Sequence, residues 1–153
     1  MKSSVVKGIA MGLVVVGAAA AVSFKPQVTK EEARAAMDRA TQFASSNGNA
    51  ALVSSLQKAN SPLHAGKTRV LALDMAGNVV ADPSQPQRVG RNILDLRDVS
   101  GKYLYVDALQ VANASGEGWV YFKTRSPITR IERPEAALVK RQGDVILLAG
   151  LSD

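Results

Sequence analysis

The segment VSGKYLYVDALQVANASGEGWVYFKTRSP, residues Val99 to Pro127, decides the fold of this chain. Its early serine-glycine pair predicts a turn, and the apolar spacing from Leu104 to Ala112 predicts a helix. The glycines from Gly116 to Gly118 predict a second turn, after which the aromatic and β-branched run from Trp119 to Lys123 predicts a strand. We therefore expect a helix that is followed, after a tight turn, by an antiparallel strand.

A second segment upstream, VLALDMAGNVVADP, predicts a β-hairpin. Two β-rich runs, Val70 to Leu73 and Asn78 to Ala81, flank a turn that contains Gly77, and Pro83 ends the second run. Together with the strand that follows the helix, this hairpin predicts a curved sheet with one face to bury.

The N-terminus has the pattern of a secretory signal. Lys2 and Lys7 precede an uncharged run from Gly8 to Val22, and the run ends in small residues. The run is shorter than the ~20 residues that a spanning helix needs. We therefore expect a signal peptide over residues 1–23, cleaved after Ala21 or Ser23, with a retained membrane anchor as the alternative. Residues 24–153 would then be a periplasmic or secreted domain.

Composition limits what this domain can do. With 153 residues the chain is long enough for one domain with a sizeable core. It has no cysteine, which excludes disulfides, thiolate metal sites and thiol catalysis. Without the two signal lysines, 17 basic residues face 13 acidic ones, a net charge of +4. These charges are scattered except for Arg125, Arg130 and Arg133, so no nucleic-acid partner is expected.

Two helices are predicted ahead of the sheet. Thr29 and Glu32 have the spacing of a capping box, and a stripe of mostly small residues follows until Asn47-Gly48. A second helix is expected from Asn49 to Ala59, with an apolar side made of Leu52, Val53 and Leu56. The single histidine, His64, comes after it in a loop and has no second ligand nearby in the sequence, so no metal site is expected.

The segment DPSQPQRVGRNILDLRD, from Asp82 to Asp98, is a long connection with two prolines. Long loops in small domains are often functional, so this one is expected to form the rim of a site. Its acidic residues Asp95 and Asp98 lie among arginines, which is typical of an ion-paired loop. No nucleophile-base motif or phosphate-binding loop occurs, so we expect neither an enzyme nor a cofactor.

These motifs together resemble the single Cache domain family, a PAS-like extracytoplasmic sensor module of bacterial receptors. The resemblance covers most of residues 24–153, through LDMAGNVVADPSQPQRVGRNILDLRDVSGKYL, GEGWVYFKTRSP and DVILLAGL. The matching positions are Asp74, Gly77, Pro83, Pro86, Gly90, Asn92, Asp98, Gly101, Lys102, Gly116, Gly118, Trp119, Val120, Tyr121, Pro127, Ala149 and Gly150.

The resemblance implies an α+β fold: a five- to six-stranded antiparallel sheet with the N-terminal helices packed across one face and a ligand pocket on the other. Such domains sense small molecules, often short carboxylates, and signal to a transmembrane receptor. Because no signalling module follows Asp153 in the sequence, we expect a stand-alone sensor or ligand-presenting module that serves a separate membrane partner.

Two positions depart from the family pattern. Glu135 stands where the family often has a lysine, and Leu138 where it often has an aromatic residue. These departures favour an alternative function, an interaction domain whose pocket is filled by side chains and which docks on a membrane partner without binding a ligand.

The candidate ligand-binding residues come from the long loop and the strand after the helix. On a strand, Trp119 and Tyr121 share one face while Val120 and Phe122 share the other. Alternation alone does not say which pair lines the pocket, and the resemblance favours Trp119 and Tyr121. Tyr103 and Tyr105 cannot both face one way at a helix start. The full predicted set is Arg88, Arg91, Tyr103, Trp119, Tyr121 and Arg125.

Overall fold

The structure, a computed structural model, describes residues 27–64 and 68–151, so the expected signal peptide lies outside the described residues. The elements, in chain order, are α1 (Lys30–Asn47), α2 (Asn49–Leu56), β1 (Arg69–Asp74), β2 (Val79–Ala81), the 3₁₀ turn η1 (Pro86–Arg88), α3 (Leu104–Ser115), β3 (Glu117–Arg125), β4 (Glu132–Gln142) and β5 (Val145–Leu151).

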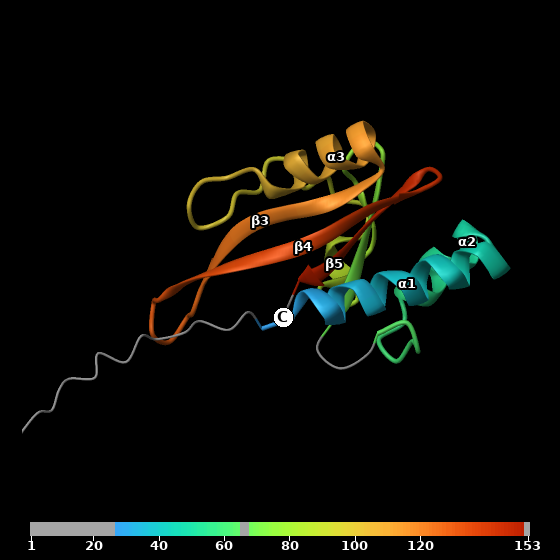
Figure 1. Ribbon diagram of the computed structural model, residues 1–153, viewed down its shortest axis with the longest axis horizontal. Helices are drawn as coiled ribbons and strands as arrows, with labels where there is room; N and C mark the ends of the chain where they lie inside the picture. Colours follow the sequence, from blue (N-terminus) through green and yellow to red (C-terminus); the bar gives the residue numbers. More distant parts are fainter. Residues whose placement is uncertain (1–26, 65–67, 152–153) are drawn as a thin grey trace, which may run out of the picture.

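The strands form one five-stranded sheet in the order β2-β1-β5-β4-β3, with every neighbouring pair antiparallel. Helices α1 and α2 lie on one face of this sheet, and α3 lies on the other (Figure 1). The α+β fold with N-terminal helices across one face is therefore confirmed, and the strand number is five.

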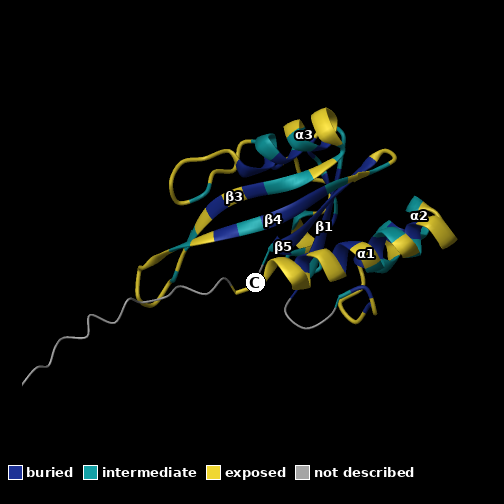
Figure 2. Ribbon diagram, in the orientation of Figure 1, coloured by how far each residue is buried: buried dark blue, intermediate teal, exposed yellow. Residues whose placement is uncertain are grey.

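Strand alternation divides the core between the two faces. On the α1 side, the small stripe of α1 packs against Val70, Leu147 and Ala149. On the α3 side, Leu104 and Ala108 pack against Ile146 and Leu148. The dark buried stripes along the central strands in Figure 2 show that both faces of the sheet are covered.

The start of α1 confirms the predicted capping box. The Glu32 amide donates to Thr29 Oγ1 (3.1 Å), and the Thr29 amide donates to Glu32 Oε2 (2.7 Å). The second helix is shorter than predicted, because it ends at Leu56 instead of Ala59. From Lys58 on the chain folds into tight turns in which amides bond three residues back, as Lys58 does to Ser55.

The predicted turn from Gly116 to Gly118 is confirmed at Gly116 and wrong at Gly118. Gly116 ends α3 with φ = 77°. Gly118 already belongs to β3, and a Cβ at this position would lie 2.8 Å from Val111 Cγ1 of α3. The strand is longer than predicted, since β3 pairs with β4 over its whole length from Glu117 to Arg125. Without a side chain at Gly118, α3 can therefore pack closely on β3.

Candidate functional site

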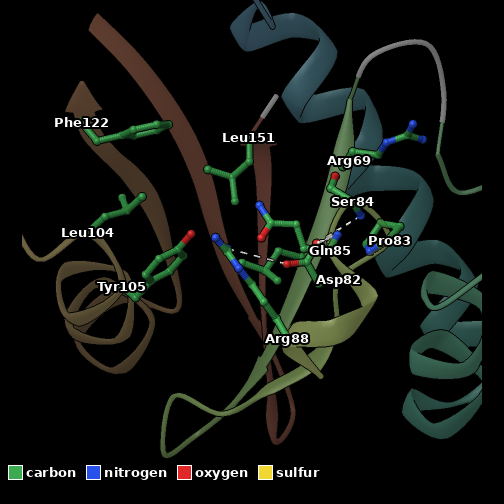
Figure 3. A pocket seen from close by; sticks show the side chains of 11 residues that line it. Arg69, Asp82, Pro83, Ser84, Gln85, Arg88, Leu104, Tyr105, Phe122 and Leu151 are labelled. Carbon is green, nitrogen blue, oxygen red and sulfur yellow. Dashed lines mark hydrogen bonds and ion pairs between the residues drawn. The ribbon is translucent and has the colours of Figure 1, made fainter. Parts of the chain in front are cut away.

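A cavity of about 220 Å³ opens on the α3 side of the sheet, beneath the start of the long loop. Its apolar wall comes from three elements, with Leu71 on β1, Leu104 on α3 and Phe122 on β3. Its polar wall contains Arg69, Asp82, Gln85, Arg88 and Tyr105. Figure 3 shows Tyr105, Arg88, Gln85 and Asp82 around the space between α3 and β1, whereas the guanidinium of Arg69 points away from it. The shape fits a small ligand with an apolar body and a polar end.

Asp82 fixes the polar wall. This residue is 7% exposed, and its Oδ1 accepts the amides of Ser84 (3.1 Å) and Gln85 (3.0 Å). Its Oδ2 lies 3.8 Å from Arg88 Nη1 (Figure 3). That distance makes an ion pair but is too long for a hydrogen bond. Arg88 is therefore attracted to Asp82 while its guanidinium keeps donors for another acceptor.

Tyr105 faces Arg88 across the cavity, and its hydroxyl points toward the guanidinium (Figure 3). Burial raises the pKa of the Tyr105 hydroxyl, and the charge of Arg88 and a hydrogen bond from its guanidinium oppose part of this rise. The phenol is therefore neutral at physiological pH and can donate a hydrogen bond.

Arg88 and Asp82 are the charged side chains drawn together inside the cavity, while the Arg69 guanidinium points away from it (Figure 3). A second groove, of about 390 Å³, shares Arg88, Tyr105 and Phe122 with the cavity. It continues past Lys123 and Arg125 toward the hairpin of β3 and β4. The combined site is therefore electrostatically suited to an anion.

The middle of the long loop is held to the turn between β1 and β2. Asp74 Oδ1 accepts the amides of Ala76 and Asn78, both at 2.9 Å. Gly77 has φ = 88°, and a Cβ there would lie 2.4 Å from Leu94 Cγ. The Asn92 side chain donates to the carbonyl of Ala76 at 2.9 Å, which ties the loop to the β1–β2 turn. The D-x-x-G and G-x-N motifs therefore position the loop.

The end of the loop is held to β3 by Asp98. Its Oδ1 accepts the Ser100 hydroxyl (2.7 Å) and the Lys102 amide (2.9 Å), and its Oδ2 accepts the Lys123 amide (2.8 Å). Lys102 Nζ donates to the carbonyl of Tyr121 at 2.6 Å. Because β3 is an edge strand, these bonds satisfy backbone groups that no further strand pairs with.

The predicted site residues of the loop and hairpin fall in different places. Arg88 lines both the cavity and the groove, and Arg125 lines the groove while it bonds Glu132 Oε1 at 2.6 Å. Tyr103 is 39% exposed, and its ring stacks under the Arg97 guanidinium, 4.4 Å from ring centroid to Cζ. Arg91 is exposed and lines neither space.

The expected alternation along β3 is confirmed, and the cavity beside Arg88 lies on the face of Val120 and Phe122. Val120 and Phe122 belong to the core on the α3 side, and Phe122 lines the cavity. Trp119 packs against the core on the α1 side. Tyr121 shares that face and is 54% exposed. The physical reason is that α3 leads directly into β3 and packs against Val120. Helix α3 therefore covers the face of β3 that carries Val120 and Phe122. A ligand-binding role for Trp119 and Tyr121 stays a prediction.

On their own face, the two aromatic rings contact the start of α1. Lys30 Nζ lies 4.8 Å from the centroid of Trp119 and 5.1 Å from that of Tyr121, and it donates to the Tyr121 hydroxyl at 3.1 Å. Arg34 lies over Trp119 as well, with 5.3 Å between Cζ and the ring centroid. These cation–π contacts join α1 to β3.

Sequence reasoning missed Arg69, Asp82, Gln85, Tyr105 and Phe122 as site residues. For two of them the sequence contains a signal. Tyr105 and Tyr103 cannot face the same way on a helix, and Phe122 and Tyr121 lie on opposite faces of a strand. Arg69 and Asp82 lie at the ends of two strands that become neighbours only in the folded sheet.

The departures from the family pattern lie away from the cavity. Leu138 is 2% exposed within the core on the α1 side. Glu135 is 4% exposed and lines a different depression with Val28, Lys30 and Pro134. Burial raises the pKa of the Glu135 carboxyl. Neither residue, nor Trp119, fills the cavity beside Arg88.

His64 is a loop residue, as predicted, and its Nε2 lies 3.0 Å from the Leu56 carbonyl oxygen. Within residues 27–64 and 68–151, no group of three or more His, Cys, Asp or Glu side chains could hold a metal ion. No helix in this part of the chain has the length and apolarity to cross a membrane.

The family described as Single Cache domain 2 matches residues 4–142 of the sequence. No curated protein shows significant sequence similarity to the chain. Two similar solved structures are the periplasmic sensor domain of a chemotaxis protein (TM-score 0.57, 20% identity) and a methyl-accepting chemotaxis protein from Vibrio parahaemolyticus RIMD 2210633 (0.61, 19%). Each match covers 80% of this chain, and 88% and 87% of those chains respectively.

A third similar structure is a Cache chemosensory domain described for its recognition of carboxylic acids. It aligns with a TM-score of 0.57 and 15% identity, over 80% of this chain and 86% of that one. At such identities these structures establish the shared fold.

Proposed function

The chain belongs to the single Cache domain family, whose members are sensor domains, and on this premise we propose that it binds a small anionic metabolite beside Arg88. A short carboxylate is the proposed ligand class. The domain would act outside the cytoplasm, as an exported sensor or ligand-presenting module for a separate membrane partner.

The observation that carries this proposal is the incompletely paired guanidinium of Arg88. It lies in the cavity at 3.8 Å from Asp82, its only ion-pair partner among the described residues. A carboxylate can accept two parallel N–H donors from one guanidinium. The Tyr105 hydroxyl on the opposite wall is a further donor for the same anion.

The size and lining of the site support a short ligand. The cavity of about 220 Å³ is small for a drug-sized molecule, and Leu71, Leu104 and Phe122 offer contact to a brief apolar stem. The Cache chemosensory domain of similar fold is described for carboxylic acid recognition. The same ligand class is proposed here because of Arg88 in this chain's own cavity.

Thermal unfolding of residues 24–153 against a panel of short carboxylates tests the proposal. A ligand at ~100 times its dissociation constant stabilises the folded state by about 2.7 kcal/mol, which raises the Tm of a domain of this size by about 10 °C. The matching neutral amides should give no shift, because they lack the charge that Arg88 recognises.

Arg88→Gln should abolish the shift, and Arg88→Lys should keep only part of it, since lysine retains the charge without the forked donors. Arg91→Gln, in the same loop but outside the cavity, is the matched control. If Tyr121→Ala and Arg91→Gln abolish the shift while Arg88→Gln does not, the ligand binds near Trp119 and Tyr121, the pair that the family resemblance favours. If no metabolite shifts the wild-type Tm, the alternative of a docking domain without a ligand replaces this proposal.

A further inference from the structure

The β3–β4 hairpin extends beyond the rest of the domain. Strand β5 pairs with β4 from Gln142 to Leu138, whereas β3 pairs with β4 as far as Glu132. The outer part of the hairpin is therefore two-stranded, and it projects past the sheet in Figure 1. From Lys123 to Pro134 no residue is buried.

The end of this hairpin is an ordered turn that presents an isoleucine to solvent. The Ser126 amide bonds the carbonyl of Ile131 at 3.0 Å, and the Arg130 amide bonds the carbonyl of Ser126 at 3.0 Å. The Ser126 hydroxyl accepts the amides of Ile128 (3.3 Å) and Thr129 (3.2 Å). Ile128 is 90% exposed and Ile131 44% exposed. The fold therefore holds an apolar side chain at the apex.

Basic residues surround this apex. Residues 123–133 contain four basic residues and one acidic residue, a net charge of +3. The acidic residue, Glu132, already bonds Arg125 at 2.6 Å and lies 3.8 Å from Lys123. Among the described residues Arg130 has no ion-pair partner. An exposed aliphatic side chain beside a basic residue without an ion-pair partner suits a lipid bilayer, which has an apolar interior and an anionic headgroup surface.

The hairpin tip stands apart from the core of the domain. Val28 and Lys30, at the start of the described chain, line a depression together with Tyr121 and Pro134 at the base of the hairpin. Beyond Pro134 the two strands continue for two further residue pairs, Thr124 with Arg133 and Arg125 with Glu132, before the turn that carries Ile128. The tip is therefore free to meet a surface that the core does not touch.

We propose that the hairpin tip, residues 126–131, docks on an anionic membrane surface. Ile128 enters the boundary between headgroups and acyl chains, while Arg130 contacts a lipid phosphate. A single inserted aliphatic side chain fits a deformable lipid surface better than a protein partner, whose interfaces bury a wide patch around aromatic anchors. This docking is independent of the ligand cavity.

Sedimentation with vesicles tests the proposal on residues 24–153, which contain both core clusters. The domain should bind vesicles of phosphatidylcholine with 30% phosphatidylglycerol, and should bind pure phosphatidylcholine at least tenfold more weakly. Each basic residue near an anionic surface strengthens binding by about fivefold. Arg130→Gln should therefore weaken binding about fivefold, and Ile128→Ser about tenfold, with an unchanged Tm because both residues are exposed.

Matched controls separate this surface from general charge and from the ligand site. Val89→Ser removes another exposed aliphatic residue elsewhere, Lys58→Gln removes an equal charge, and Arg88→Gln disables the proposed ligand site; all three should bind as the wild type does. The proposal is overturned if Ile128→Ser binds vesicles like the wild type, or if anionic vesicles do not bind. Loss of vesicle binding on adding inorganic phosphate at the lipid's concentration would instead assign a soluble phosphate site.

Discussion

At the scale of single residues, many of the family motifs are scaffold and not ligand contacts. Asp74 and Asp98 each begin a D-x-x-G turn, and each accepts several hydrogen bonds from the residues just after it. The glycines of both turns have positive φ, at Gly77 and Gly101. The sequence could predict these turns because their chemistry is local. It could not predict that Asp98 also bonds the Lys123 amide, 25 residues away.

Removal of the Asp98 carboxylate should destabilise the domain. Asp98→Ala leaves the Lys123 amide and the turn amides without their acceptor, which should lower the free energy of unfolding by about 2 kcal/mol. Asp95→Ala, an exposed position in the same loop, should change it by less than about 0.5 kcal/mol. Urea denaturation measures both values, and equal effects of the two substitutions would contradict the assigned role.

The Asp98 carboxyl should also make the stability of the domain depend on pH. Burial alone would raise the pKa of Asp98, but hydrogen bonds from the Ser100 hydroxyl and the Lys102 and Lys123 amides lower it to about 2, from its usual 3.8. Its contribution is therefore complete above the usual value and is lost as the pH falls from about 4 toward 2. The stability difference between wild type and Asp98→Ala should shrink over this window.

At the scale of elements, local signals predicted those with clear boundaries. The capping box of Thr29 and Glu32 gave a helix start that the structure confirms, whereas α3 runs to Ser115, past the predicted end at Ala112, and stops only at Gly116. Strand β4 had no such signal, because Pro134 and Glu135 are rare in strands. Pro134 is tolerated because β5 has already ended there, so no neighbour on that side needs its missing N–H.

The two glycines around the α3–β3 junction should respond to substitution for different reasons. Gly116→Ala should cost about 1 kcal/mol because an L residue disfavours φ = 77°. Gly118→Ala should cost a similar amount through its contact with Val111. In the double variant with Val111→Ala, the effect of Gly118→Ala should largely disappear, whereas that of Gly116→Ala should persist. Chemical denaturation of the single and double variants checks this, and unchanged stability of both single variants would contradict it.

At the scale of the whole molecule, the fold was predictable and the exact lining of the site was not. Alternation along β3 follows from strand geometry, but the choice of face depends on where α1 and α3 pack. Arg88 could be predicted because it lies in the long loop. Arg69, Asp82 and Phe122 join it only through the pairing of β1 with β2 and the packing of α3 on β3.

The last prediction concerns cleavage of the N-terminal segment during export. The uncharged run from Gly8 to Val22 has 15 residues, which as a helix would span about 22 Å, less than the ~30 Å of a bilayer core. Cleavage is therefore expected, and intact-mass measurement of the exported protein should give an N-terminus between Val22 and Lys25. Replacing Ala19 and Ala21 by lysine should block cleavage, since small residues are required there, and should retain the domain on the membrane. A wild-type mass that includes Met1 would contradict cleavage and make the protein an anchored domain.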